Sequence, residues 1–234
     1  MNGPPLIFVP GLMCDAALFR AQASALEQSC AVSHADLSRD DSIPAMASRL
    51  LAVAPAQFCL AGLSMGGIVA FEAWRQAPER VAGLVLMNTT PFADSPARQT
   101  VRKDQMARVR GGHLRTVVME ELKPNYLGAN TRDDDVLLEE IYAMANRLGP
   151  DVFYRQSSAL MGRADSAQTL TTITCPTLII AGDEDDVCPP DLHEIMHQAI
   201  ASSDLHILSG CGHLSTMERP NEVTALLRHF LSAF

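Results

Sequence analysis

The pentapeptide Gly62-Leu63-Ser64-Met65-Gly66 carries the strongest chemical signal in the chain. It joins an apolar stretch, residues 58–63, to a segment with helical character, residues 66–76. In that context the G-x-S-x-G pattern is typical of a nucleophile elbow, a sharp turn that presents the serine hydroxyl at the top of a sheet. Glycines suit the turn because the serine is forced into strained dihedral angles and the flanking positions approach neighbouring backbone. We therefore predict that Ser64 is a catalytic nucleophile.

A phosphate-binding turn is the main alternative for this segment, because a glycine-rich loop before a helix can also bind anions, with the serine as N-cap. A dinucleotide-binding loop would follow G-x-G-x-x-G, and here Ser64 occupies the place of the second glycine. A P-loop would need G-K-[ST], which the segment lacks. A nucleotide-binding α/β module is therefore a remote alternative.

A serine hydroxyl needs a base that removes its proton during attack. Among the seven histidines, His213 follows an apolar stretch in the small-residue loop Gly210-Cys211-Gly212, where an imidazole can reach over a sheet edge. We predict that His213 is the general base. His34, at the end of a predicted strand, is a weaker candidate, and His113 could touch substrate, although a surface turn is favoured for it. A structural role is favoured for the histidines in predicted helices or strands: His193, His197, His206 and His229.

The base needs a carboxylate that fixes its tautomer and stabilises the imidazolium. The loop after the apolar stretch 177–181 offers Asp183, Asp185 and Asp186, and the residues alone leave the choice among them open. A solvated acidic loop and a cation site are the alternatives here. The loop lacks the D-x-[DN]-x-[DN]-G spacing of a calcium site, so we predict no bound metal.

Short apolar runs alternate with longer amphipathic ones on both sides of a long helical segment, the pattern of parallel strands joined by helices. The predicted strands are residues 6–9, 31–34, 58–63, 81–87, 177–181 and 205–208. The helices between and after them are residues 16–27, 44–54, 66–76, 190–199 and 218–234. We predict an α/β fold, a mostly parallel sheet of about six strands with helices on both faces.

Residues 91–166 show only helical periodicity and interrupt this alternation. We therefore predict a core made of residues 1–90 and 167–234, with residues 91–166 inserted as a helical lid. Insertions at the carboxyl edge of such sheets lie above the ligand crevice. The insert carries 11 basic and 11 acidic residues against 7 and 16 in the remainder, so the net negative charge lies outside it.

Composition excludes several classes of protein. The net charge of -9 and the absence of a Lys/Arg block argue against a nucleic-acid partner. The apolar runs are far shorter than the roughly 18 residues of a membrane-spanning helix, and the N-terminal stretch lacks the basic region of a secretory signal. The six cysteines include no C-x-x-C pair, and most are expected to be reduced core thiols. We expect a cytoplasmic protein.

The elbow, acidic loop and histidine loop, in the order Ser, Asp, His, resemble the α/β-hydrolase fold enzymes over nearly the whole chain. The family's acid lies three residues beyond a glycine and four before a proline, which implies Asp185, between Gly182 and Pro189. The resemblance also implies an oxyanion hole made by the backbone N–H groups of Leu12 and Met65. Pro10 departs from the family's His-Gly-x segment, which removes a side chain but leaves both N–H donors.

The resemblance implies a serine hydrolase that cleaves a small-molecule carboxylic ester or thioester through an acyl-enzyme, without a metal or organic cofactor. The insert is similar to the lids of enol-lactone hydrolases, carboxylesterases and methyl-ester esterases. Hydrolysis of C–C bonds or enol-lactones, cofactor-independent lyase or perhydrolase chemistry, and a ligand receptor with an intact triad remain alternatives. The insert's mixture of apolar residues and cations would suit an acyl group with a distal carboxylate. Amphipathic lid helices that pack inward while their charges face water explain the same residues and are the favoured interpretation, so neither the acyl group of the substrate nor the oligomeric state is predicted.

Overall fold

A single parallel sheet forms the centre of the computed structural model, which describes residues 3–122 and 125–234. The strand order is β2-β1-β3-β4-β5-β6, and every neighbouring pair is parallel. The strands are β1 (Leu6–Val9), β2 (Val32–His34), β3 (Phe58–Leu63), β4 (Val81–Met87), β5 (Thr177–Gly182) and β6 (Ser203–Leu208). The predicted fold class, an α/β fold with about six parallel strands, is confirmed.

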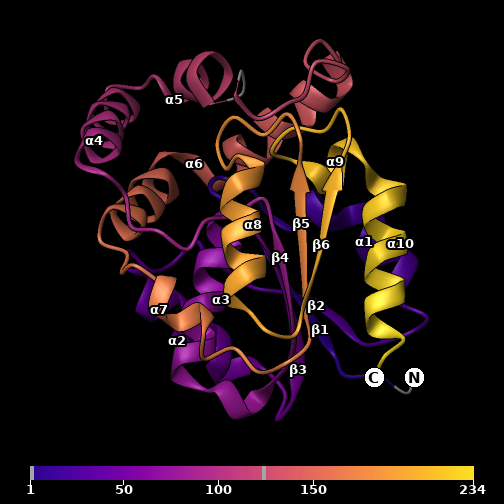
Figure 1. Cartoon of the computed structure of the whole chain (residues 1–234). Helices are drawn as coiled ribbons and strands as arrows, with labels where there is room; N and C mark the ends of the chain where they lie inside the picture. The colour runs from indigo at the N-terminus through magenta and orange to yellow at the C-terminus, as the bar shows by residue number, and fades with distance from the viewer. Residues whose placement is uncertain (1–2, 123–124) are drawn as a thin grey trace.

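Helices cover both faces of the sheet (Figure 1). On one face, α1 (Arg20–Leu26) packs against α10 (Pro220–Leu231). On the other lie α2 (Ile43–Val53), α3 (Met65–Gln76) and α8 (Pro190–Ala199). Because both faces are covered, the central strands are apolar without alternation, and every residue of β1, β3 and β5 is buried.

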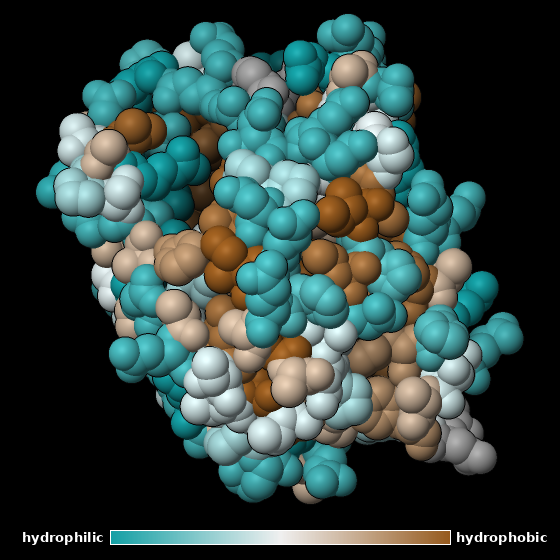
Figure 2. Space-filling view, viewed as in Figure 1, coloured by the Kyte–Doolittle hydropathy of each residue, from teal (hydrophilic) through white to brown (hydrophobic). Residues whose placement is uncertain are grey.

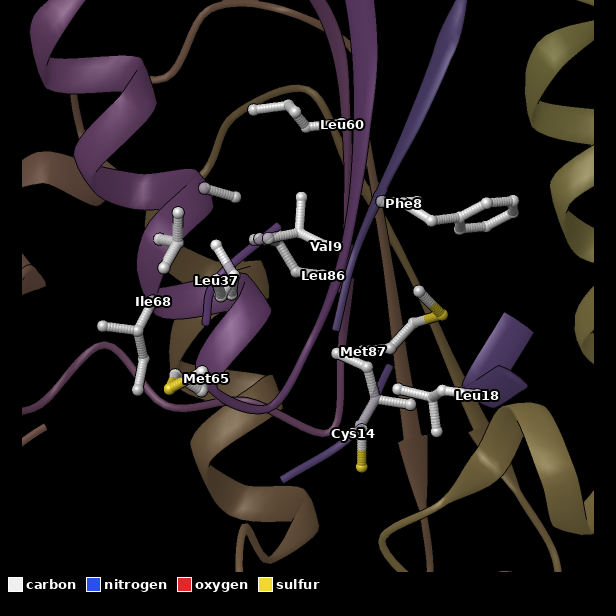
Figure 3. Packing of buried hydrophobic residues seen from close by; sticks show 14 of the residues in the cluster. Phe8, Val9, Cys14, Leu18, Leu37, Leu60, Met65, Ile68, Leu86 and Met87 are labelled. Carbon is white, nitrogen blue, oxygen red and sulfur yellow. The ribbon is translucent and has the colours of Figure 1, made fainter. Parts of the chain in front are cut away.

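The core lies on both sides of the sheet. Phe8 points away from Val9 and Leu60, towards the side of α10, whereas the latter two face α3 (Figure 3). Phe8 also stacks on Phe19, with ring centroids 4.5 Å apart. Packing on both faces fixes the register of the strands and hence the loops that follow them.

Between β4 and β5 the described residues form helices and turns only. They are α4 (Pro96–Arg110), the short α5 (Leu114–Thr116), a π-helical turn (Val117–Leu122), α6 (Asp135–Met161) and α7 (Ala167–Leu170). α6 is kinked at Gly149, with φ 79°, immediately before Pro150. α4 and α5 lie towards the ends to which the strand arrows point (Figure 1). This segment therefore extends over the edge of the sheet at which Ser64 stands.

Two of the predicted helices are wrong in detail. Residues 16–27 form a 3-10 turn (Ala16–Phe19) followed by α1. Residues 218–234 do not form one helix: the short α9 (Ser215–Glu218) ends before α10 begins at Pro220. Proline lacks an N–H and its ring clashes with the preceding turn, so α9 cannot continue through it. Glu218 consequently belongs to the loop region that carries His213.

The described helices include none that combines the length and the apolar character needed to cross a membrane. All six cysteines are free, five of them buried and Cys175 half-buried, as expected for reduced core thiols. Burial raises the pKa of the Cys59 and Cys14 thiols to about 12, so both stay protonated and unreactive near neutral pH.

Candidate active site

Ser64 occupies the sharp turn between β3 and α3, with φ 55° and ψ -116°. A Cβ on Gly62 would lie 2.4 Å from the carbonyl carbon of Gly66, and one on Gly66 would lie 1.8 Å from the carbonyl oxygen of Val9. Real side chains do not fit at these distances, so the turn requires both glycines. The strained, tightly packed turn that the G-x-S-x-G pattern predicts is present.

The backbone of Ser64 is fixed by the end of β4. Its N–H donates to the carbonyl of Met87 over 2.9 Å, and its carbonyl accepts from the hydroxyl of Thr89 over 2.7 Å. Positive φ angles occur at three described residues other than glycine, namely Met13, Ser64 and Asn88. All three follow the carboxyl ends of neighbouring strands, and strain of this kind clusters at functional sites.

His213 and Asp185 form a buried pair. Nδ1 of His213 lies 2.8 Å from Oδ2 and 3.0 Å from Oδ1 of Asp185, and the two side chains are 2% and 0% exposed. His213 stands in the loop after β6, and Asp185 in the loop after β5. This contact fixes the proton on Nδ1 and leaves Nε2 as the basic nitrogen.

Asp185 is held as a carboxylate by a ring of donors. Its Oδ1 accepts from the backbone N–H groups of Val187 and Cys188, at 2.9 and 2.8 Å, and its Oδ2 accepts from Nδ2 of Asn88 at 3.0 Å. Burial pushes the pKa of Asp185 upwards, but His213 and these hydrogen bonds outweigh it and hold the pKa below its usual value.

The two neighbouring aspartates are placed differently. Both are exposed; Asp183 accepts a long hydrogen bond of 3.3 Å from the N–H of Cys211, and Asp186 stands at the wall of the cavity described below. Of the three aspartates in this loop, Asp185 is the one that contacts His213.

Hydrogen bonds to Met87 and Asn88, at the end of β4, link the backbone of Ser64 to the Asp185–His213 pair. Asn88 follows Met87, the acceptor of the Ser64 N–H, and its Nδ2 donates to Asp185 and to the carbonyl of Gly212 at 3.1 Å. In the described part of the chain no hydrogen bond joins the Ser64 hydroxyl directly to His213. Catalytic hydrogen bonds of this kind are commonly long in unliganded enzymes and shorten when substrate binds.

Glu218 braces the loop that carries His213. The buried carboxylate accepts from the N–H groups of Gly212 and Leu214, both at 3.1 Å, on either side of the histidine. It also accepts from the N–H of Gly128 at 2.8 Å and from the hydroxyl of Thr131 at 2.6 Å. One carboxylate therefore ties the histidine loop to the helical segment between β4 and β5.

Neither Asn88 nor Glu218 is among the residues singled out in the sequence. The signal for Asn88 is its position directly after a strand that neighbours the elbow strand, because carboxyl ends of parallel strands meet at one edge. Glu218 carries no such signal, since its predicted place was the start of the last helix.

Leu12 and Met65 line the same cavity as Ser64. Met65 is the first residue of α3, so its N–H has no acceptor within the helix. The N–H of Leu12 takes part in no hydrogen bond among the described residues. The next N–H, that of Met13, donates to Oε1 of Gln156 in α6 over 2.8 Å and anchors the loop. Two N–H groups without an acceptor among the described residues thus stand beside the serine, one in the loop after β1 and one at the start of α3.

The cavity in front of Ser64 has a volume of about 530 Å³. Figure 2 shows the surface hollowed at the upper left, where α4 and α5 stand away from the body of the molecule. Its apolar wall includes Ile68, Leu122, Tyr126 and Leu160, and its charged wall is made of Asp94, Arg98, Arg102, Glu121, Arg163 and Asp186. The ring of Tyr126 lies 5.3 Å from that of His213, which places the histidine next to the cavity.

His193 has a structural role. It is fully buried, its Nε2 accepts from the N–H of Thr89 at 3.1 Å, and its Nδ1 lies 3.2 Å from the carbonyl of Pro189. These contacts require the neutral ring, and burial lowers the pKa of His193. Among the described residues no cluster of three His, Cys, Asp or Glu side chains is arranged to hold a metal ion.

The sequence model of the Alpha/beta hydrolase family matches residues 6–226. Among solved structures, an esterase from Thermogutta terrifontis with bound malate is 29% identical, with a TM-score of 0.90 over 99% of this chain and 90% of that chain. An enol-lactonase from Burkholderia xenovorans LB400 is 21% identical, with a TM-score of 0.86 over 99% and 92% of the two chains, and shares the fold.

Two curated relatives are hydrolases. One is a 2-hydroxy-6-oxononadienedioate/2-hydroxy-6-oxononatrienedioate hydrolase from Pseudomonas sp, which is 29% identical over 73% of this chain. The matched region covers 62% of the length of that relative. A pimeloyl-[acyl-carrier protein] methyl ester esterase from Photobacterium profundum is 28% identical over 82% of this chain and 77% of that protein.

Proposed function

The chain belongs to the alpha/beta hydrolase family, and we propose that it is a serine hydrolase that cleaves small-molecule carboxylic esters or thioesters. The esterases among its relatives support this reaction class. The observation that carries the proposal is the buried 2.8 Å contact between His213 and Asp185 beside the cavity that Ser64 lines. In this proposal Ser64 is the nucleophile, His213 the general base and Asp185 its carboxylate partner.

In the first step, Oγ of Ser64 attacks the carbonyl carbon of the ester while Nε2 of His213 takes the hydroxyl proton. The carbonyl electron pair moves to oxygen, and the N–H groups of Leu12 and Met65 stabilise that oxyanion. Each such donor contributes about 2.7–4 kcal/mol to the transition state. The C–O bond to the alcohol then breaks, and the leaving oxygen receives the proton from Nε2.

In the second step, water attacks the acyl-enzyme and gives one proton to Nε2 of His213. The oxyanion forms again, the bond from the acyl carbon to Oγ of Ser64 breaks, and Oγ recovers the proton from Nε2. The products are the free acid and the starting enzyme. Asp185 stays ionised throughout, in keeping with its lowered pKa.

The division of the chain into a core of residues 1–90 and 167–234 and a lid of residues 91–166 is part of the same proposal. It is supported by the described residues between β4 and β5, which form helices and turns without a strand, and by the residues that this segment gives to the cavity, such as Arg102, Tyr126 and Leu160. A lid in this place would exclude water from the acyl-enzyme and select the substrate.

Hydrolysis of a C–C bond is the second candidate, because the Pseudomonas relative acts on 2-hydroxy-6-oxononadienedioate or the corresponding trienedioate. The same three side chains would serve that reaction, with a carbon leaving group in place of the alcohol oxygen. A panel that contains methyl esters, thioesters and such an oxo-dienedioate separates the two candidates by relative kcat/KM.

Labelling with a fluorophosphonate probe tests the nucleophile. We expect covalent labelling of the wild-type protein and of the exposed control Ser29→Ala, and none of Ser64→Ala. Full labelling of Ser64→Ala would refute the assignment. Repeated turnover of p-nitrophenyl butyrate would distinguish an enzyme from a ligand receptor that hydrolyses one molecule slowly.

A further inference from the structure

Three arginines share the cavity with Ser64: Arg98 and Arg102 from α4, and Arg163 from the turn after α6. Arg102 and Arg163 both contact the buried carboxylate of Asp94, with Nε of Arg102 at 2.5 Å and a terminal nitrogen of Arg163 at 2.9 Å. Both guanidinium side chains are 7% exposed. Two buried cations therefore face a single buried anion.

The arginines have more donors than the described residues accept. A guanidinium carries five N–H groups, yet only Nε of Arg102 finds an acceptor, so its terminal nitrogens have no hydrogen-bond partner in the described ranges. Arg163 uses Nε on the carbonyl of Phe92 as well as its contact with Asp94. Half-buried Arg98 makes no side-chain hydrogen bond or ion pair within the same ranges. These donors belong to residues that line the cavity, so a bound ligand can supply the acceptor that the described side chains lack.

The other acids of the cavity wall do not supply that acceptor. Glu121 pairs with Arg108, which lies outside the cavity wall, and accepts from Gln105. Asp186 is exposed to solvent. Burial, with the charges of Arg102 and Arg98, lowers the pKa of Arg163 even though Asp94 raises it. Positive charge therefore exceeds negative charge at this end of the cavity.

We propose that Arg98 and Arg102 form a subsite for a carboxylate group of the substrate. The inference rests on the proposed function and narrows it to an ester that carries a second, free carboxylate. Arginine suits this role because its planar guanidinium donates two parallel hydrogen bonds to a carboxylate. The apolar side chains Ile68, Leu122 and Leu160 line the same cavity and suit a methylene chain. The free carboxylate could belong to the acyl part or to the alcohol part of the ester.

Three matched sets of substrates test the subsite. The first contains monomethyl esters of linear dicarboxylic acids with four to seven carbons, and the second contains acetate esters of ω-hydroxy acids. The third contains methyl esters of linear monocarboxylic acids of equal length, which carry no free carboxylate. We expect one charged set to have a kcat/KM at least tenfold above the neutral set, and the preferred set identifies which part bears the carboxylate. Equal kcat/KM across all three sets would overturn the proposal.

Variants at the arginines test the same point. We expect Arg98→Gln and Arg102→Gln to raise KM for the preferred charged esters at least tenfold and to reduce the ratio of kcat/KM for charged over neutral esters by a similar factor. Lys103→Gln is the matched control, since it removes a positive charge from the exposed side of the same helix. Arg102→Gln removes an ion-pair partner of Asp94, whereas Arg98→Gln breaks no ion pair among the described residues. Arg98→Gln therefore tests the subsite even where Arg102→Gln fails to fold. Equal losses on charged and neutral esters would overturn the proposal.

Binding without turnover separates this proposal from the proposed function. Titration of Ser64→Ala with glutarate or adipate in a calorimeter should show binding that Arg98→Gln weakens at least tenfold and Lys103→Gln does not. Binding of this kind by a protein that hydrolyses no ester would support the subsite and refute the hydrolase. Ester hydrolysis with no dicarboxylate binding would refute the subsite and leave the hydrolase intact.

Discussion

Nδ1 of His213 lies 2.8 Å from Oδ2 of Asp185, in a contact shielded from solvent. The two residues come from loops after adjacent parallel strands, β6 and β5, so the sheet brings them together without any contact local in sequence. The next strand, β4, supplies Asn88, and β3 supplies Ser64. Four consecutive strand ends therefore build the candidate site.

Replacing Asp185 with Asn should lower kcat for p-nitrophenyl butyrate about 10⁴-fold, because the amide favours the wrong tautomer of His213. The exposed neighbour variant Asp183→Asn should keep kcat within about twofold, the effect expected of a surface change. Steady-state kinetics of the two variants check this. A larger loss in Asp183→Asn than in Asp185→Asn would show that the wrong carboxylate has been assigned.

Replacing Gly66 with Ala should destabilise the protein by at least about 1–3 kcal/mol, the usual cost of forcing atoms into a packed site. The new Cβ would stand 1.8 Å from the Val9 carbonyl oxygen, and backbone cannot move aside as a flexible side chain can. Urea unfolding measures the change. Gly162→Ala is the control, because its Cβ would meet only one atom, at an ordinary 3.6 Å. Equal midpoints for the two variants would contradict the steric account of the elbow.

The strand ends around the elbow are predictable from sequence because apolar runs there stop at polar or conformationally special residues. β1, β3 and β4 have the expected boundaries, residues 6–9, 58–63 and 81–87. The predicted last helix, residues 218–234, begins two residues before Pro220, whereas α10 begins at that proline. A proline in a helix-like pattern therefore deserves to be treated as a boundary.

The supporting residues of the site are not predictable in the same way. Asn88 acts on partners 97 and 124 positions away, and Glu218 on a partner 90 positions away. Most of the bonds that Glu218 accepts come from backbone N–H groups, which every residue except proline carries. The order of side-chain types in the sequence therefore does not predict these hydrogen bonds. For the charged wall of the cavity, the sequence gives only the number of basic residues in the segment 91–166, since it does not tell which of them face inward.

The free energy of unfolding should fall as pH falls from about 7.5 to 5, partly through His193. Its pKa is lowered in the folded protein, so the unfolded chain binds the proton first and stability is lost below the unfolded pKa of about 6.5. One proton contributes at most about 1.4 kcal/mol per pH unit. Urea unfolding across this pH range should show a smaller slope for His193→Gln than for the wild type.

His34 at the end of β2 also has a lowered pKa and acts in the same direction, so His193→Gln should retain part of the slope. His206→Gln in β6 serves as the control, because it removes a histidine and leaves the contacts of His193 with Thr89 and Pro189 in place. An unchanged slope in His193→Gln would mean that the ring is not held neutral by Thr89 and Pro189.

Replacing Glu218 with Gln should lower kcat about 10–100-fold with KM changed less than about threefold, since Glu218 positions His213 and touches no substrate. One carboxylate oxygen would become an NH₂ group facing N–H donors, so the amide cannot accept all the bonds that Glu218 accepts from Gly212, Leu214 and Gly128. Stability should fall by about 1.5–3 kcal/mol, the usual range for hydrogen bonds to a charged group. Steady-state kinetics and urea unfolding measure both effects, and the exposed Glu222→Gln is the control. A stability loss with unchanged kcat would limit Glu218 to a purely structural role.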